Sequence, residues 1–477
     1  MSAAKADLRE KPHHPDWPLA CLVFVFVFVL GLLAVHDSTT WLHLRSGQEI
    51  LTQRALPAVD AYSYTVAGHG WTSDSWLADV LFRVIHDQFG PRGLWVLKSL
   101  VAAAAFALLL PVNPASPLVS AAVLSFGAVA SSTGFVELPA IFDLLLMAAM
   151  IRLLRPRRFK PAVIVQTAAL QCLWANLHGA TALLGLWIVL LKTFKVSLRT
   201  EKKERLWHWA ILGASLLALL ANPHGFALIP HAFLGMEAAA TAWQPLSPYF
   251  NLFLLFCAAG SYSCTILLQQ EFFLTLTAAS VLAASLLVPE FRPLAILACC
   301  PVIAMAIGYF LKPREVEIMG VAKLAGFMGL LLALQWFFVT VPFGARGYGY
   351  PLVDAAASYL DANGARGRMF NEVESGAALL GLSSRPVFVD SRLALYGAEF
   401  IRDAMRWSAQ FKFLDDVYGF DYAVILNRRT LYPAQALDEA ADWRLAFADD
   451  TALIYARRDG KSAELVKDRA DSLLRPN

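Results

Sequence analysis

Charged residues are scarce in this chain. Only 16% of its 477 residues are Asp, Glu, Lys or Arg, whereas 58% are hydrophobic. The mean hydropathy of +0.53 excludes a soluble protein of this size, because a soluble surface needs more polar residues. The net charge of +3 is too small to indicate a nucleic-acid partner. The composition therefore predicts a polytopic protein of the lipid bilayer.

Cysteine is also rare. All six cysteines lie in apolar stretches without metal-type spacing, so neither disulfides nor a cysteine-bound metal is expected. The more polar C-terminal part contains no glycine-rich phosphate loop and no Ser-His-Asp order. The C-terminal part therefore carries no familiar motif of a hydrolase or of a nucleotide-binding protein.

Long apolar segments recur within residues 18–341, which we predict to be the membrane domain. We expect about eleven transmembrane helices. Residues 18–35 form the first, which lacks a small-residue cleavage site and should remain as an anchor. The others are 94–111, 118–133, 138–154, 161–176, 180–196, 206–221, 249–267, 272–288, 293–311 and 324–341.

Basic loops predict the orientation. The densest runs of Lys and Arg are at 155–160, 192–205 and 312–314, and such runs accumulate in cytoplasmic loops. Counting spans places all three on one side. The N-terminal tail, residues 1–17, is then cytoplasmic, whereas the first loop, residues 36–93, and the C-terminus are extracytoplasmic.

A reporter that works only outside the cytoplasm tests this orientation. It should be active when fused after Gln88 or Asn477 and inactive after Arg158, because the basic loops stay inside. Activity after Arg158 would overturn the orientation.

The chain becomes more polar near its C-terminal quarter, and short β-type runs alternate there with helical ones. This pattern predicts a small extracytoplasmic α/β domain over residues 342–477. The last two strands should pair antiparallel across Asp449 and Asp450. A further strand is expected at VFVDSR, where Asp390 and Arg392 either contribute to binding or form a structural ion pair.

Polar side chains gather on the predicted outer side. Such groups are costly near lipid and usually mark a site or a water-filled cavity. The set consists of Asp37, His43, Asp74, Glu137, Asn176, His178, Asn222, His224, Gln244 and Arg292, together with Trp41, Trp71 and Trp76.

Each of these residues also has a structural explanation. Asp37 and the hydroxyls after it could cap the helix expected at WLHLRSG. His178 and His224 lie in NLHG and NPHG turns, where a histidine often only hydrogen-bonds a carbonyl. Arg292 could extend toward headgroups, and the tryptophans could form an interfacial belt.

Several short blocks resemble GT-C-type bacterial membrane glycosyltransferase-like proteins. The first is D-x-x-x-W-x-H-L-x-x-G, from Asp37 to Gly47, followed by DAYSYTVAGHGWTSDSWLADVLF. Later blocks, in the same order as in that group, are WANLHG, ANPHG, WQP and FNEVESGAALLGLSSRPVFVDSRLALYG. The resemblance extends from about residue 36 to residue 457.

The resemblance implies a GT-C-like fold and an inverting glycosyltransferase of the bacterial inner membrane. Such an enzyme moves a sugar from a polyprenyl-phosphate carrier to an acceptor on the outer face, in envelope or exopolysaccharide synthesis. Asp37 is then the expected general base. Arg292, assisted by His178 or His224, should bind the phosphate. The other polar and tryptophan residues of the set are expected to contact substrate.

Three positions depart from the pattern of that group. Thr39 stands where the group has a second acid. Ser75 stands where the group often has a glutamate, although Asp74 lies one place earlier. Leu138 stands where an arginine is expected. A divalent ion usually needs more than one carboxylate, so Thr39 weakens the expectation of a metal and no cofactor is assigned. Either the reaction is metal-independent, or Asp74 and Glu137 replace the lost acids at a divalent metal. The alternative function is a catalytically inactive GT-C-like subunit that binds a lipid-linked glycan or another membrane protein of a glycan pathway.

Overall fold

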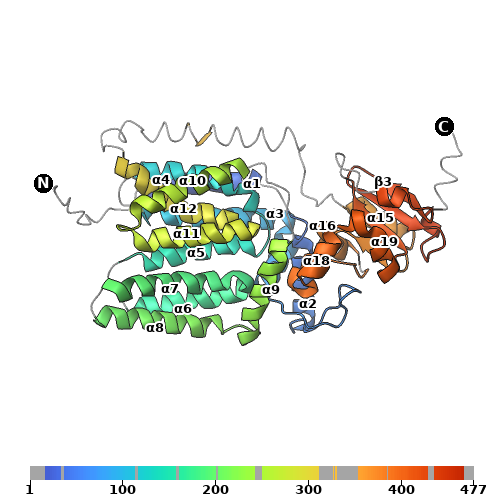
Figure 1. Cartoon of the computed structure of the whole chain (residues 1–477), viewed down its shortest axis with the longest axis horizontal. Coiled ribbons are helices and arrows are strands. Elements are labelled where there is room, and N and C mark those ends of the chain that lie inside the picture. The colour runs from blue at the N-terminus through green and yellow to red at the C-terminus, as the bar shows by residue number, and fades with distance from the viewer. Residues whose placement is uncertain are drawn as a thin grey trace.

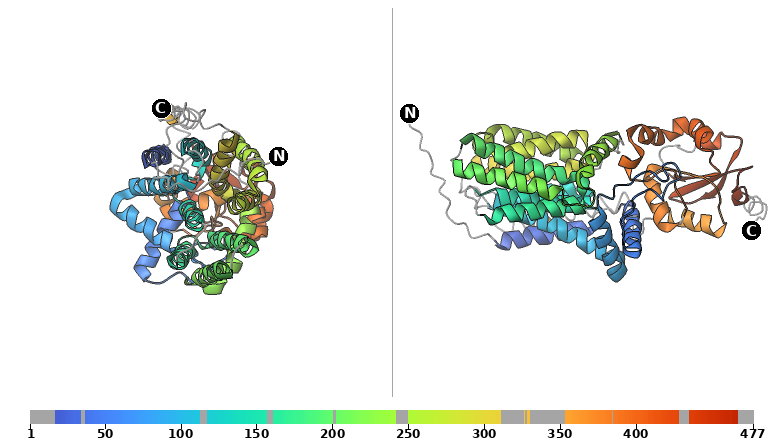
Figure 2. Two further views of the ribbon diagram at one scale, coloured as in Figure 1. Left: turned by 90° about the vertical axis from the view of Figure 1, so that its left-hand side faces the viewer. Right: turned by 90° about the horizontal axis from the view of Figure 1, so that it is seen from below.

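The computed structural model describes residues 17–33, 37–112, 117–156, 161–199, 202–241, 250–310, 326, 328–329, 353–383, 385–427 and 435–466. Apolar helices lie side by side in a long bundle, and a small α/β domain sits at one end of it (Figure 1). The right-hand view of Figure 2 shows the same two parts in line.

The bundle is formed by helices that follow one another along the chain. They are α1 (Trp17–Leu33), α3 (Trp76–Leu109), α4 (Pro117–Ser131), α5 (Ala140–Leu154), α6 (Ala162–Leu177), α7 (Ala182–Arg199), α8 (Lys202–Leu219), α10 (Phe250–Leu267), α11 (Phe272–Leu287) and α12 (Arg292–Phe310). Short 3₁₀ turns extend several of them, namely η1 (Leu110–Val112), η2 (Ser132–Gly134), η3 (Gly179–Thr181), η4 (Gly225–Ala227) and η5 (Pro289–Phe291).

Five stretches of the described helices are long and apolar enough to cross a membrane. They are Trp76–Val112, Pro117–Gly134, Gly179–Leu198, Phe250–Leu267 and Pro289–Phe310. Shorter apolar helices pack between them, so the chain is a polytopic helical membrane protein. Each predicted span as far as 293–311 coincides with a helix of the bundle. The last, 324–341, lies almost wholly outside the described residues, so the count of about eleven stays a prediction.

Helix α3 begins earlier than the sequence analysis suggests. Its first part occupies residues 76–89, which the sequence assigns to the first loop, and Gly90 with a φ of 64° precedes Pro91 at a break in the helix. Proline cannot donate a helical hydrogen bond and disfavours the helical conformation in the residue before it, so the kink has a local cause. The first part carries too many charged residues, such as Arg83 and Asp87, to be recognised as a span.

A four-stranded sheet forms the centre of the C-terminal domain. Its order is β1 (Met369–Asn371), β2 (Tyr422–Leu426), β4 (Ala452–Arg457) and β3 (Trp443–Ala448). The pair β1–β2 is parallel and the other two pairs are antiparallel, which confirms the predicted pairing of the last two strands. The predicted domain boundary at residue 342 lies outside the described residues.

Helices cover both faces of this sheet. Side chains of β2 alternate between two buried clusters: Tyr422 and Val424 pack on one side, Ala423 and Ile425 on the other. A strand buried on both faces explains why YAVIL is continuously apolar. The covering helices are α15 (Asp354–Ala362), α16 (Val373–Leu382), α17 (Leu393–Tyr396), α18 (Ala398–Met405), α19 (Trp407–Tyr418) and α20 (Gln435–Asp438).

The predicted strand at VFVDSR is wrong. Val387 forms only a single parallel bridge, with Ser63 of the first loop. The backbone N–H of Val387 donates to Tyr62 at 3.0 Å, and that of Tyr64 donates to Val387 at 3.2 Å. The apolar pattern correctly indicated burial, but a partner more than 300 residues away leaves no local signal.

The first loop packs between the C-terminal domain and the bundle and contacts both. Within it, α2 (Thr40–Gln53) packs against α16. Arg45 donates to the carbonyls of Leu380 at 2.6 Å and Ser383 at 3.1 Å, which the end of α16 leaves open. At Gly381 a β-carbon would come within 2.5 Å of Cβ of Trp41, so this close approach requires glycine.

Helix α9 (Leu228–Thr241) completes the junction from the bundle side. It contacts α17 and α18 of the C-terminal domain, and Figure 1 shows it between the bundle and that domain. The C-terminal domain therefore covers the end of the bundle where the first loop and α9 lie.

Candidate functional site

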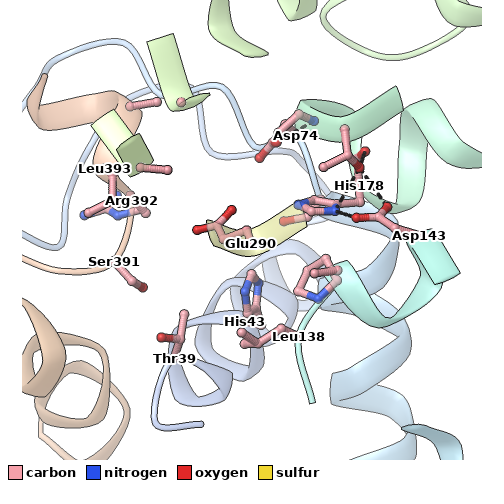
Figure 3. A pocket seen from close by; sticks show the side chains of 18 of the residues that line it. Thr39, His43, Asp74, Leu138, Asp143, His178, Glu290, Ser391, Arg392 and Leu393 are labelled. Atoms are coloured by element: carbon pink, nitrogen blue, oxygen red, sulfur yellow. Dashed lines mark hydrogen bonds and ion pairs between the residues drawn. The ribbon is translucent and has the colours of Figure 1, made fainter. Parts of the chain in front are cut away.

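A cavity of about 440 Å³ lies at this junction. The bundle, the first loop, α9 and residues 391–395 of the C-terminal domain all contribute to its lining. Figure 3 shows Arg392 on one side, His178 on the opposite side, and Glu290 between them. The residues predicted from the sequence that line it are Asp37, His43, Asp74, Trp71, His178 and Arg292.

Asp37 lines the cavity just ahead of α2. Its Oδ1 accepts the backbone N–H of Thr39 at 2.7 Å. This bond closes a turn before the helix. The N-cap residue of α2 is Thr39 and no side-chain hydrogen bond caps it, so the predicted capping role of Asp37 is wrong. The bond to Thr39 uses one carboxylate oxygen, and a carboxylate has further lone pairs with which to accept a proton.

Two histidines of the cavity wall are each held by a buried aspartate. Nδ1 of His178 lies 2.7 Å from Oδ2 of Asp143, and Nδ1 of His43 lies 2.7 Å from Oδ1 of Asp79. The aspartates are only 1% and 2% exposed, respectively. A histidine that donates its Nδ1–H to a carboxylate is fixed in orientation and tautomer. Each pair therefore leaves Nε2 for a ligand.

Hydroxyl and indole groups fix the two aspartates in turn. Asp143 accepts hydrogen bonds from Nε1 of Trp174 at 2.8 Å and Oγ1 of Thr181 at 2.7 Å. Asp79 accepts one from Oγ of Ser46 at 2.6 Å. Because every buried carboxylate oxygen needs such partners, these networks position the imidazoles rigidly.

Asp79 and Asp143 were not selected in the sequence analysis. Asp143 lies in the apolar run AIFDLLL and Asp79 in WLADVLF. A lone acid inside an apolar helical stretch is costly near lipid and is itself a signal of a functional or paired group. That signal was available in the sequence, but the histidine partners lie 35 and 36 residues away.

His178, in the turn between α6 and η3, carries a positive charge at neutral pH. Burial alone would lower its pKa, but the charge and hydrogen bond of Asp143, with smaller contributions from Asp74 and Glu290, raise the pKa to about 9. The imidazolium is therefore a cation placed among carboxylates at the cavity wall.

Three carboxylates also face the cavity: those of Asp37, Asp74 and Glu290. Asp74 accepts the backbone N–H of Ala180 at 3.0 Å, and its other oxygen lies 3.9 Å from Nε2 of His231 on α9. Glu290 is exposed into the cavity from η5. Within the described ranges, no three His, Cys, Asp or Glu side chains are grouped as a metal ion would require, so we assign no step to a metal.

Glu137 does not line the cavity, contrary to its predicted contact with substrate. Its Oε1 lies 2.9 Å from Nζ of Lys98, and both side chains are fully buried. Its backbone carbonyl accepts Oγ1 of Thr40 at 2.9 Å. The sequence suggested a substrate contact because Glu137 has no cation near it along the chain. Its partner, Lys98, lies on α3, almost 40 residues earlier.

Replacing Glu137 with Ala should lower the free energy of unfolding by about 3–5 kcal/mol, because Lys98 would remain buried without its counter-charge. Thermal unfolding of the purified protein in detergent measures this effect. The double replacement Glu137→Leu with Lys98→Met should regain most of the loss, since it leaves no buried charge. An unchanged melting temperature for Glu137→Ala would contradict the structural role.

Four predicted residues lie behind the cavity wall. Trp76 donates its Nε1–H to Asn176 at 3.0 Å, and Asn176 donates to a backbone carbonyl after α8 at 2.9 Å. Asn222 closes the turn after α8, and Nε2 of His224 lies 3.1 Å from the carbonyl oxygen of Ser73. These contacts support the turns that carry the lining residues, and none of the four side chains lines the cavity.

Arg292 lies at the bundle edge of the cavity. Its Cζ is 5.3 Å from the ring centre of Phe250 and 5.6 Å from that of Phe253, and it also lines a small adjoining cavity beside those rings. Its contact with a phosphate stays a prediction.

Of the remaining predicted residues, Trp41 packs against the C-terminal domain, and Gln244 lies outside the described residues.

No protein-family model matches the sequence, and no curated protein matches it. The structure is similar to the cryo-EM structure of the arabinofuranosyltransferase AftD from Mycobacteria, with a TM-score of 0.45 and 14% sequence identity. The match covers 92% of this chain and 40% of the other. This chain thus spans less than half the length of that protein. At this level the likeness assigns neither a family nor a residue role.

Proposed function

We propose that this protein is an inverting GT-C-type glycosyltransferase that moves a sugar from a polyprenyl-phosphate carrier to an acceptor at the outer face of the bacterial inner membrane. The main support is the cavity at the end of the membrane bundle, which brings Asp37 together with the two aspartate-held histidines. A lipid-borne donor can reach a site at the end of a membrane bundle sideways through the bilayer. The product would enter envelope or exopolysaccharide glycans.

In this proposal Asp37 is the general base. It takes the proton of the acceptor hydroxyl while that oxygen bonds to the anomeric carbon of the sugar. The bond between this carbon and the phosphate oxygen breaks, and its electron pair leaves with the phosphate. One displacement of this kind inverts the configuration at the anomeric carbon.

His178 stabilises the departing phosphate. With a pKa of about 9 its imidazole is protonated at neutral pH, and a charge-assisted hydrogen bond from Nε2 offsets the charge that develops on the leaving group. Arg292 supplies a second donor from the bundle edge, and His43 presents Nε2 to the same space. Asp79 and Asp143 are positioning residues, because they act through the histidines.

A catalytically inactive subunit that binds a lipid-linked glycan is the second candidate. It is favoured by the bond between Asp37 and the N–H of Thr39, since a turn-closing carboxylate needs no further role. Both candidates require a lipid ligand, but only the first consumes it.

Mass spectrometry of lipids that co-purify with the protein tests the shared requirement. A polyprenyl-phosphate sugar should be retained in near-equal amount to the protein and should be displaced by added undecaprenyl phosphate. The variant His178→Gln should retain less of it, whereas Gln48→Ala, on the exposed side of α2, should retain as much as the wild type. Recovery of bulk phospholipid alone would contradict both candidates.

A further inference from the structure

Four residues that line the cavity each carry a buried polar atom without a hydrogen-bond partner in the described part of the chain. One is Nε of Arg292 at the bundle edge, and the other three are Oγ of Ser73, Oγ of Ser391 and Nη1 of Arg392. Buried polar groups in folded proteins are nearly always paired. Because these atoms surround one open cavity, they offer hydrogen bonds to a ligand with several polar groups.

Arg392 is fixed in place, although one of its nitrogens has no partner. Its Nη2 lies 2.7 Å from Asp60 and 2.6 Å from Asp390, and its Nε donates to Asp390 at 2.9 Å. The guanidinium carbon lies 4.7 Å from the ring centre of Trp71 and 4.9 Å from that of Tyr62. The side chain is only 7% exposed. Nη1 is thus a rigidly positioned donor.

The charge around Arg392 excludes an anionic ligand. The two carboxylates of Asp60 and Asp390 are fully buried beside the guanidinium of Arg392. Arg45 lies over the same Tyr62 ring, but Glu49 accepts the hydrogen bond of the Tyr62 hydroxyl and offsets the charge of Arg45, so the cluster as a whole is negative. A phosphate or a carboxylate would be repelled, whereas a neutral oxygen can still accept the Nη1–H. We assign the phosphate of the donor to the opposite wall because His178 and Arg292 offer cationic hydrogen-bond donors there, although Asp74, Asp143 and Glu290 line that wall as well.

Trp71 adds an aromatic surface to the same wall. It lines the cavity and meets Tyr62 edge-on, with ring centres 5.3 Å apart. An indole presents an apolar face, while the nearby hydroxyls of Ser73 and Ser391 can both donate and accept hydrogen bonds. Pyranose and furanose rings have the complementary combination of an apolar C–H face and a rim of hydroxyls.

We infer that this wall, formed by Trp71, Ser73, Ser391 and Arg392, is the acceptor subsite and that the acceptor is a neutral saccharide. Its identification as the acceptor side rests on the proposed transfer reaction. The two walls of the cavity then have different ligands. The bundle wall binds the phosphate of the donor, and the wall shared by the first loop and the C-terminal domain binds the acceptor saccharide. Asp37 lines the same space and can reach the hydroxyl that reacts.

Saturation-transfer NMR on the full-length protein in lipid nanodiscs tests the subsite without any turnover. The probes are cellobiose, lactose and chitobiose, with digalacturonic acid as the anionic counterpart. Neutral disaccharides should receive saturation and the acid should not. Ser391→Ala and Ser73→Ala should each raise the half-saturating concentration about 3- to 10-fold, as expected for one lost hydrogen bond, and Trp71→Ala should abolish the signal. Ser408→Ala, exposed on α19, should leave it unchanged.

A second arm separates this inference from the proposed transfer. Binding of undecaprenyl phosphate should be unaffected by Ser391→Ala and weakened by His178→Gln. Equal saccharide signals in wild type and Trp71→Ala, or preferred binding of the acidic probe, would overturn the subsite. Sugar transfer that is indifferent to Ser391 and Trp71 would also overturn it while leaving the transferase intact. Saccharide binding that depends on both residues, in a protein that transfers no sugar, would support the subsite and contradict the transferase.

Discussion

The replacement Asp37→Asn should reduce sugar transfer by about 10²–10⁴-fold, the usual contribution of a general base. Asparagine keeps the shape of aspartate, and its carbonyl oxygen can still accept the N–H of Thr39 that Asp37 accepts at 2.7 Å. The start of α2 and the binding of the donor should therefore be preserved. The rate is measured as release of polyprenyl phosphate from a labelled lipid-linked sugar, with a membrane extract as the source of acceptor.

Asp87→Asn is the matched control for this experiment. Asp87 is an exposed acid on the first part of α3, paired with Arg83 at 2.7 Å and absent from the cavity lining, so its replacement should leave the rate unchanged. If Asp37 served only to close the turn before α2, Asp37→Asn would also turn over at the wild-type rate. That outcome would remove Asp37 from the chemistry.

The replacement Asp143→Asn should shift the pH dependence of transfer. In the wild type, His178 has a pKa of about 9, so the cationic imidazole is present at neutral pH and is lost as the pH rises through 9. Without the negative charge of Asp143, the pKa should fall to the ordinary value near 6.5 or below it, because burial lowers it further. At pH 8 the variant should then be about 30-fold slower, from the smaller protonated fraction.

A pH–rate profile from pH 5 to 10 checks this prediction. The descending limb should lie near pH 9 in the wild type and at or below about pH 6.5 in the variant. Activity of Asp143→Asn should return toward the wild-type value at pH 5.5, which a misfolded protein would not show. Asparagine can still accept hydrogen bonds from Trp174 and Thr181. Superimposable profiles would show that the charge of His178 plays no part in the reaction.

The architecture of the bundle was largely predictable from the sequence. Composition and long apolar runs indicate helices directly, because a helix in lipid must be apolar over its whole spanning length. The start of α3 was missed because residues 76–89 mix apolar and charged residues, which is typical of an amphipathic helix and not of a span. The partner of Val387 was missed because its single bridge to Ser63 is not periodic.

The site was predicted less completely than the fold. Asp37, His43, Asp74 and His178 do line one cavity, because the helix ends and loops that carry them meet at the same end of the bundle. The aspartates behind the two histidines could not be paired with them from spacing alone, since each pair joins different helices or loops. Glu137 was misjudged for the same reason: its partner Lys98 lies on α3.

The contribution of Arg392 illustrates a further limit of sequence reasoning. The sequence offered binding or a structural ion pair as alternatives. The structure shows the ion pair, and binding stays a proposal. Arg392 is paired with Asp60 and Asp390, yet it lines the cavity with Nη1 unpartnered in the described part of the chain. Only the packing of the first loop against the C-terminal domain brings these groups together.

The most direct test of the central claim is the conversion of the lipid itself. Purified protein in nanodiscs is incubated with a polyprenyl-phosphate sugar extract and a membrane-derived acceptor, and both lipids are quantified by mass spectrometry over time. We expect the sugar-bearing lipid to decline while free polyprenyl phosphate rises by the same amount, with no such change for Asp37→Asn. Constant amounts of both lipids, in the presence of demonstrated lipid binding, would contradict a transferase and leave the inactive binding subunit.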